Sequence, residues 1–244
     1  MNHVSALRIL VSLVDCLRRR DVPYRRVLQA TAETLSGSFM LVCAAVGFVG
    51  ASLCWQAAWQ ARRVLGDQSF IGPEYLVIMT NEFAPLMVGT MLAARGGAGL
   101  AARLATRKTT YQTDALTLMG DDPVRVFALP EIIASVVTSA VLAPPALLAG
   151  EIAGVFTMKM AFQVEPASFV AFDALQAGDL WFSLIKAVVF GLAVSVMGAR
   201  AGLSARPDAS GVGEAAMRGV VDGSVAVLIL DAALDGVRFA TGFP

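Results

Sequence analysis

The sequence predicts an all-α integral membrane protein, and two observations carry that prediction. Of the 244 residues, 57% are hydrophobic and only 16% are charged, against about 25% charged residues in soluble domains. The charged residues also gather in short segments between long apolar runs, which is typical of helices that cross a bilayer. The formal net charge is zero, so no electrostatic attraction to nucleic acid is indicated.

Residues 1–33 are expected to form an N-terminal interfacial segment. Apolar residues between Leu7 and Leu17 recur at helical spacing, with arginines and Asp15 at the other positions. This pattern predicts an amphipathic helix that lies in the membrane surface; a helix packed on a soluble core is the alternative. The first long apolar run begins only near Leu35, too late for a cleavable signal peptide, so we expect the first span to be an uncleaved signal anchor.

Residues 34–244 are expected to form a single transmembrane domain of five helices. The first span has no charged residue between Thr34 and Ala61, and about 20 apolar residues suffice to cross the hydrocarbon core. The second and third spans are each interrupted by one acid, Glu82 and Glu131. The approximate spans are 35–60, 75–94, 124–150, 180–198 and 219–237.

The distribution of positive charge indicates the orientation of the chain. With the N-terminus in the cytoplasm, most of the 19 Lys and Arg residues fall on cytoplasmic segments, as the positive-inside rule requires. Five spans then place the C-terminus on the opposite side. We therefore expect a multi-pass protein with a cytoplasmic N-terminus and a C-terminus outside.

The cytoplasmic connector between the second and third spans is predicted to carry a short helix over 110–119. Thr109 or Thr110 can cap the start of this helix, and Gly120 can provide a left-handed stop after it. The small residues at 96–99 allow helix backbones to approach closely. A short helix between two spans, on the positively charged side, is well placed to meet a cytoplasmic partner.

Three sequence elements around this connector resemble the MlaE/YrbE permeases of MCE-type lipid transport systems. The first element is Glu82 with Pro85. The second comprises Arg95, Gly97, Ala98, Ala101 and Ala102. The third is the most specific and comprises Gln112, Asp114, Ala115, Leu116, Met119, Gly120, Asp122 and Pro123. Asp122 and Pro123 also suit the N-cap and the first turn of the third span.

Some positions depart from the pattern of this family. The family has glutamate where this chain has Arg103 and Tyr111, and arginine where it has Glu131. A basic residue often stands at the position of Asn81. Because the changes at Arg103 and Glu131 are opposite in sign, we hypothesise that these two positions form an ion pair with reversed polarity. Independent drift of the two positions is the alternative.

The resemblance implies the permease subunit of an ABC transporter in the bacterial inner (cytoplasmic) membrane. Members of the family form homodimers, bind an ABC ATPase on the cytoplasmic side and dock a hexamer of MCE-domain proteins on the periplasmic side. They move phospholipid or a related membrane lipid between the inner membrane and the MCE tunnel. This sequence has no Walker-type motif, so ATP and Mg²⁺ are expected on the partner ATPase, and no cofactor on this chain.

The resemblance also implies roles for individual residues. Glu82, with Asn81 and Pro85, is expected at the substrate cavity, because an acid inside a span costs about 2.5–3.5 kcal/mol and usually faces a bundle interior or a wet cavity. A hydrogen bond between helices is the alternative for Glu82. The ATPase contact is expected to involve Arg103, Tyr111, Gln112, Asp114, Leu116, Met119, Gly120 and Asp122.

Other candidate sites are weaker. For Lys186, Asp222 and Asp231, all inside expected spans, structural pairing is favoured. His3 is the only histidine, so neither a metal site nor a His-based catalytic site is expected. The alternatives to a lipid permease are an ABC permease for another hydrophobic solute, such as a sterol or an organic solvent, a non-transport membrane scaffold, and a membrane-embedded enzyme acting on lipids.

Overall fold

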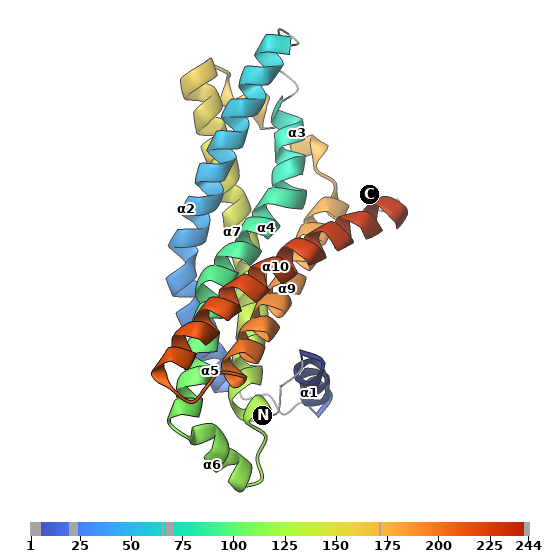
Figure 1. Cartoon of the computed structure of the whole chain (residues 1–244). Coiled ribbons are helices and arrows are strands. Elements are labelled where there is room, and N and C mark those ends of the chain that lie inside the picture. Colours follow the sequence, from blue (N-terminus) through green and yellow to red (C-terminus); the bar gives the residue numbers. More distant parts are fainter. Residues whose placement is uncertain (1–5, 20–23, 65, 67–70, 171, 242–244) are drawn as a thin grey trace.

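The part of the chain that the structure describes is an elongated bundle of helices, with no strand among the described residues (Figure 1). The structure is a computed structural model. It describes residues 6–19, 24–64, 66, 71–170 and 172–241. The short helix α6 (Gln112–Leu118) lies at one tip of the bundle, which we call the α6 end. The other end, near α8 (Pro166–Phe169), is called the α8 end.

Four helical stretches are long and apolar enough to cross a membrane. They are Tyr24–Val64, Ile71–Thr109, Val124–Phe162 and Ala177–Leu203. Their length and composition make the chain a multi-pass membrane protein. The helix α10 (Ala209–Thr241) adds a further long element, but its passage through the membrane, and with it the count of five spans, stays a prediction.

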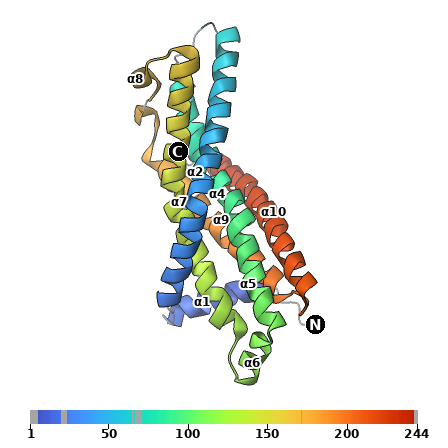
Figure 2. The same ribbon diagram turned by 90° about the vertical axis from the view of Figure 1, so that its left-hand side faces the viewer.

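The longest helices form the backbone of the bundle. α2 (Tyr24–Val64) and α7 (Leu129–Phe162) run side by side and reach further toward the α8 end than α10 does (Figure 1, Figure 2). α8 and the short 3-10 helix η4 (Phe172–Ala174) connect α7 to α9 (Ala177–Leu203). α9 packs between α7 and α10, so many of its side chains are enclosed by neighbouring helices.

The expected spans are shorter than the helices that contain them. The third was expected to end near residue 150 but continues to Phe162, and the expected segment boundary at residue 33 lies inside α2. Hydropathy marks only the part of a helix that suits hydrocarbon, whereas backbone hydrogen bonds and packing extend the helix beyond it. The orientation of the chain in the membrane is not altered by these longer bounds and stays a prediction.

The α1 helix (Ala6–Arg19) lies at the α6 end, outside the main bundle (Figure 1). Ile9 and Cys16 are buried against a cluster from α5, η3, α7 and α9. Leu7 and Val11 are 72% and 54% exposed. α1 therefore packs one part of its apolar surface on the protein and leaves another part open, and its expected position in the membrane surface stays a prediction.

The stretch from residue 71 to residue 109 is a single rod with two wider turns. Its α-helical parts are α3 (Ile71–Ile78), α4 (Ala84–Leu92) and α5 (Ala98–Thr109). The π-helical turns η1 (Met79–Phe83) and η2 (Ala93–Gly97) join them. A third π-helical turn, η3 (Val124–Ala128), leads into α7.

Prolines account for two of these wide turns. Pro85 has no N–H to offer the carbonyl of Asn81, and Pro130 has none for the carbonyl of Val126, so the α-helical hydrogen-bond pattern fails at both places. In η1 the N–H of Ala84 bonds to the carbonyl of Met79 instead. The carbonyl of Val126 accepts a hydrogen bond from Arg26 Nη1 at 3.3 Å. Pro85 thus shapes the turn that carries Glu82.

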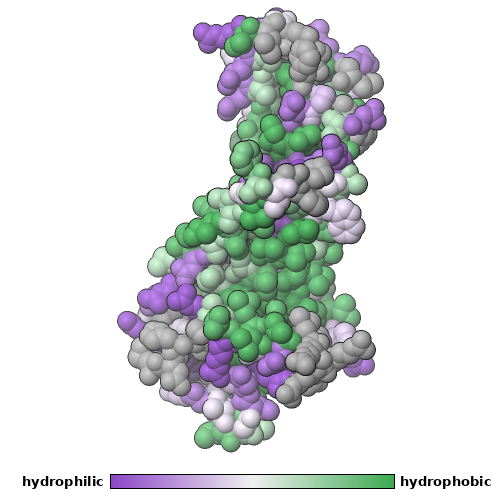
Figure 3. All heavy atoms as spheres, turned by 90° about the vertical axis from the view of Figure 1, so that its right-hand side faces the viewer, coloured by the Kyte–Doolittle hydropathy of each residue, from purple (hydrophilic) through white to green (hydrophobic). Residues whose placement is uncertain are grey.

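Glycines bring η2, α9 and α10 into close contact. A Cβ atom on Gly198 would lie 2.8 Å from the carbonyl oxygen of Gly97, and one on Gly219 would lie 2.9 Å from the same atom. No side chain fits at these distances, so the helices cross here because the residues are glycines. On the side of the bundle drawn in Figure 3, a broad apolar surface lies between polar side chains at the α6 end and a polar band nearer the α8 end.

The connector between α5 and α7 differs in part from its prediction. α5 ends at Thr109 and α6 starts at Gln112, after Tyr111 with a φ of 57°. The predicted Thr cap is wrong, because the hydroxyls of Thr109 and Thr110 bond back to the carbonyl of Thr106. These hydroxyls therefore end α5 rather than begin α6.

Two local signals in the same connector are confirmed. Gly120 has a φ of 89°, the left-handed conformation that stops a helix. The Asp122 side chain accepts a hydrogen bond from the N–H of Val124 at 3.0 Å, as an N-cap residue does. Both residues act on their own neighbours in the chain, which is why the sequence was enough to predict them.

Candidate functional site

The centre of the candidate site is Lys186 on α9, whose side chain is fully buried. Its Nζ donates a hydrogen bond to Glu82 Oε2 at 2.9 Å. It also forms ion pairs with Asp231 Oδ1 at 2.9 Å and with Asp235 Oδ1 at 2.5 Å. We call these four residues the Lys186 cluster.

Three elements bring the cluster together. Asp231 and Asp235 are four residues apart and so lie on one face of α10, while Glu82 comes from the π-helical turn η1. A buried charge without a partner is costly, and here three carboxylates surround one ammonium. The side chains of Glu82 and Asp235 are 39% and 34% exposed, so the cluster is closed on the side of Lys186 and open on the side of these carboxylates.

A second polar network adjoins the cluster through η1. Asn81 Nδ2 donates to Asp179 Oδ1 at 2.9 Å, and Arg238 Nη2 donates to the same oxygen at 2.6 Å. The Phe182 ring lies between the two networks, with Lys186 Nζ 5.2 Å and the Arg238 guanidinium 4.7 Å from its centroid. Cations at these distances are attracted to the ring face.

The same three carboxylates could in principle bind a cation. One oxygen from each of Glu82, Asp231 and Asp235 lies within 4.8 Å of the others. However, the ammonium of Lys186 already lies among these oxygens, so a metal ion would have to displace it. The arrangement is therefore that of a buried ion-pair cluster, and the expectation that the chain holds no metal stays a prediction.

The sequence anticipated part of this site. Pairing of Lys186 and Asp231 is confirmed by their ion pair, whereas Asp222 is exposed and forms no ion pair with a described residue. Asp235 and Arg238 were missed because the last expected span ended at residue 237, which placed them at its edge. Their spacing from Asp231 along one helical face was a usable signal.

The α6 end carries a second charged contact, between α5 and α7. Arg103 Nε donates to Glu131 Oε1 at 3.1 Å, and Arg103 Nη2 donates to Glu131 Oε2 at 2.5 Å. The Arg103 side chain is 45% exposed and that of Glu131 is 14% exposed. The two residues that depart in opposite senses from the family pattern thus form a two-bond ion pair, while a reversal of polarity stays a hypothesis.

The tip of the α6 end is apolar. Tyr111, Leu118 and Met119 are 65%, 90% and 77% exposed, and Leu116 is half-buried. Large apolar side chains this exposed on a short helix are typical of a surface that meets another protein. Gln112 is exposed beside them.

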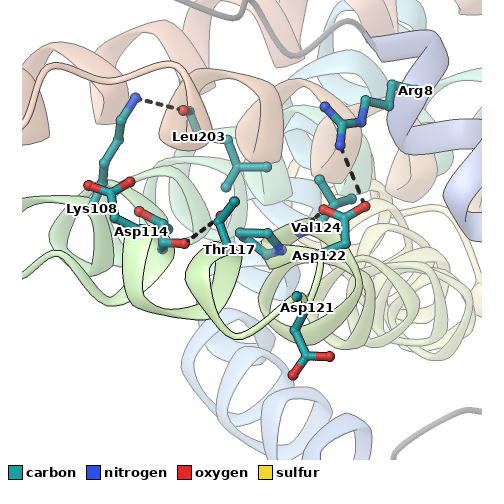
Figure 4. A pocket seen from close by; sticks show the side chains of 11 residues that line it. Arg8, Lys108, Asp114, Thr117, Asp121, Asp122, Val124 and Leu203 are labelled. Atoms are coloured by element: carbon teal, nitrogen blue, oxygen red, sulfur yellow. Dashed lines mark hydrogen bonds and ion pairs between the residues drawn. The ribbon is translucent and has the colours of Figure 1, made fainter.

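Other predicted contact residues face a cavity rather than the tip. This cavity, of about 460 Å³, lies between α1, α6 and the end of α9 and is lined by Asp114, Gly120 and Asp122. In Figure 4, Arg8 of α1 reaches Asp122, with the charged atoms 3.7 Å apart. Lys108 of α5 donates to the carbonyl of Leu203 at the end of α9 at 3.0 Å. One contact thus joins α1 to the loop after α6, and the other joins α5 to α9.

A multi-pass helical protein with charged side chains enclosed in its bundle and an apolar tip on a connecting helix has the features of a transporter's membrane subunit. The family model described as Permease MlaE matches residues 27–237. The chain belongs to this family of ABC transporter permeases. As such a permease it is a transport component that works with an ATPase.

Curated relatives support the same class. A probable ABC transporter permease protein of Rickettsia felis is 32% identical over 198 residues, which cover 79% of this chain and 74% of that protein. A probable ABC transporter permease of Synechocystis is 28% identical over 204 residues, covering 83% and 77%. One from Porphyra purpurea is 25% identical over 219 residues, covering 89% and 83%.

Proposed function

We propose that this chain is the permease subunit that moves phospholipid, or a related lipid, between the inner membrane and a tunnel of MCE-domain proteins. A separate ATPase, which binds ATP and Mg²⁺, drives the movement. The Lys186 cluster is the observation that carries this proposal. The headgroup of a zwitterionic phospholipid carries a cationic amine that needs anionic partners inside the membrane, and the partly exposed carboxylates of Glu82 and Asp235 offer them within the bundle.

The cluster also favours an amphiphilic cargo over a purely apolar solute. A sterol or an organic solvent carries no charged group that could pair with the cluster. Charged residues inside a membrane are costly and therefore rare where they have no function. Asn81 lies beside Glu82 but is held by Asp179, so we assign Asn81 to orienting the site rather than to contact with lipid.

In the proposed orientation the α6 end faces the cytoplasm and the C-terminus faces the periplasm. The exposed tip of α6 is then the contact for the ATPase. Movement of α6 passes to its flanking segments, where Asp122 pairs with Arg8 of α1 and Lys108 bonds to Leu203 of α9. The α8 end faces the MCE hexamer. A second copy of the chain completes the permease as a homodimer.

Reconstituted transport tests the role of Glu82. The Glu82→Gln variant keeps the size of the side chain but loses the charge on the open side of the cluster. If its charge-assisted hydrogen bonding contributes about 1.4 kcal/mol to moving the lipid, transfer of fluorescent phospholipid from proteoliposomes containing the ATPase slows about tenfold. Asp222→Asn is the matched control, because Asp222 is an exposed acid on α10 outside the cluster.

Equal transfer rates for the Glu82→Gln and Asp222→Asn proteins would contradict the assignment of Glu82. The partners are tested separately by affinity purification in mild detergent. Recovery of an ATPase and an MCE-domain protein with the chain is the expected result, and recovery of neither would contradict the proposed system.

A further inference from the structure

A second polar cavity at the α6 end lies between α2, α5 and the start of α7. Its volume is about 390 Å³, and Arg26, Glu33, Arg107 and Glu131 are its charged lining residues. Glu131 is engaged by Arg103. The cavity therefore holds two arginines, Arg26 and Arg107, that form no ion pair with either of its acids.

Neither arginine has a carboxylate partner within the described part of the chain. Arg26 donates one hydrogen bond, to the carbonyl that Pro130 leaves without an α-helical donor, although a guanidinium has five N–H groups to offer. Arg107 is half-buried, and its guanidinium stacks 4.3 Å from the centroid of the Phe127 ring. Stacking on a ring orients a guanidinium but leaves its N–H groups free to bind oxygen atoms.

The surface beyond the cavity is apolar. On α2, Met40 follows Glu33 by about two helical turns and lies on the same face, and its side chain is 82% exposed. On α7, Val137 stands in the same relation to Pro130 and is 41% exposed. A molecule with its polar group in the cavity would thus find an exposed apolar surface on α2 and α7 directly beyond it.

We propose that this cavity binds the phosphate of a phospholipid in the leaflet at the α6 end, with the acyl chains along α2 and α7. Arginine is suited to phosphate because its planar N–H groups pair with two oxygens at once. The site is separate from the Lys186 cluster, since Arg107 follows Glu82 by roughly 38 Å along the same helical rod at 1.5 Å per residue. It holds a bound lipid rather than the transported one.

Ligand-dependent thermal unfolding of the purified chain in neutral detergent tests the site without ATPase or transport, so its outcome is independent of the proposed function. The probes are didecanoyl phosphatidylglycerol, didecanoylglycerol, which has the same chains without phosphate, and inorganic phosphate. The phospholipid is expected to raise the unfolding temperature more than the diacylglycerol does. In Arg107→Gln its apparent affinity falls about tenfold, as for loss of a hydrogen bond to a charged group.

Three further variants make the result specific. Arg26→Gln weakens phospholipid binding as Arg107→Gln does, which keeps the test decisive if loss of the Phe127 contact impairs folding. Glu33→Gln strengthens it, because an acid on the cavity wall repels phosphate. Arg125→Gln, an exposed arginine of η3 that does not line the cavity, leaves it unchanged.

Two outcomes would overturn the proposal. Equal stabilisation by phospholipid and diacylglycerol in the unmodified chain would show that the phosphate is not recognised. An Arg107-dependent shift produced as strongly by inorganic phosphate alone would assign the cavity to a soluble anion and not to a lipid.

Discussion

The Lys186 cluster and the Arg103–Glu131 pair use the same chemistry in opposite surroundings. Lys186 is fully buried among three helices, whereas Arg103 is 45% exposed at the α6 end. Water can replace a lost partner at Arg103 but cannot reach Lys186. The difference teaches that the ion pairs of this protein should be judged by what surrounds them and not by their distances, which are similar.

The difference in burial also indicates different roles for the Lys186 cluster and the Arg103–Glu131 pair. Replacing a buried ion pair by apolar residues is often neutral for stability, so its presence points to a use other than holding the fold together. An exposed pair contributes little to stability in any case. The Arg103–Glu131 pair lies between α5 and α7, beside the connector, which indicates that it helps to hold α6 in position. The two regions can thus be compared by measuring stability and transport separately.

Removal of Lys186 is expected to have the largest effect. Lys186→Met leaves three carboxylates with no cation among them, and breaking a buried pair from one side costs about 3–5 kcal/mol. Fluorescence-detected size-exclusion chromatography after a heat challenge should show a large fall in unfolding temperature. Arg218→Met is the control, because Arg218 pairs with Glu214 on the exposed side of α10 and such pairs contribute at most about 1 kcal/mol.

The cluster can then be neutralised as a whole. Adding Glu82→Gln, Asp231→Asn and Asp235→Asn to Lys186→Met removes the unpaired charges, and stability should largely recover. Lipid transfer should not recover with it. A quadruple variant that regains both stability and transport would show that the cluster serves only the fold.

A middle-sized effect is expected where η2, α9 and α10 cross. Gly198→Ala places a methyl group 2.8 Å from the Gly97 carbonyl oxygen, so the helices must move apart, and overpacking of this kind costs about 1–3 kcal/mol. Gly213→Ala on α10 meets no atom within 4 Å and should be neutral or stabilising by up to about 1 kcal/mol. Unchanged thermal unfolding of the Gly198 variant would show that the crossing is loose.

The sequence predicted best the features that depend on near neighbours. Four of the five apolar runs, the stop at Gly120 and the cap at Asp122 follow from residues a few positions away, and these were confirmed. The predicted Thr cap of α6 was wrong because the hydroxyls of Thr109 and Thr110 donate instead to the carbonyl of Thr106, in the last turn of α5. Local signals therefore predict a structure well only where no second local partner competes.

The site itself depended on contacts between distant residues. Lys186 lies 104 positions from Glu82, and no periodicity in one helix shows which face of another it meets. The resemblance to the family drew attention to Glu82, whereas Arg238 had only its helical spacing from Asp231 as a signal, and Asp179 was found by its contacts alone. The π-helical turn at residues 79–83 was missed as well, since a proline predicts a disturbed helix but not the form of the disturbance.

The smallest effect on stability, and the sharpest comparison, is expected from exchanging Arg103 and Glu131. Arg103→Glu brings two carboxylates together, and Glu131→Arg brings a second arginine against Arg103 near Arg107. Each single variant should lose about 1 kcal/mol or less, because the contact is partly exposed. The double variant restores an ion pair with the family's polarity and should recover both the unfolding temperature and ATP-driven lipid transfer better than either single one. If the double variant transfers lipid no better than the worse single variant, the two positions are not coupled through their charges, and drift at each position explains the departure.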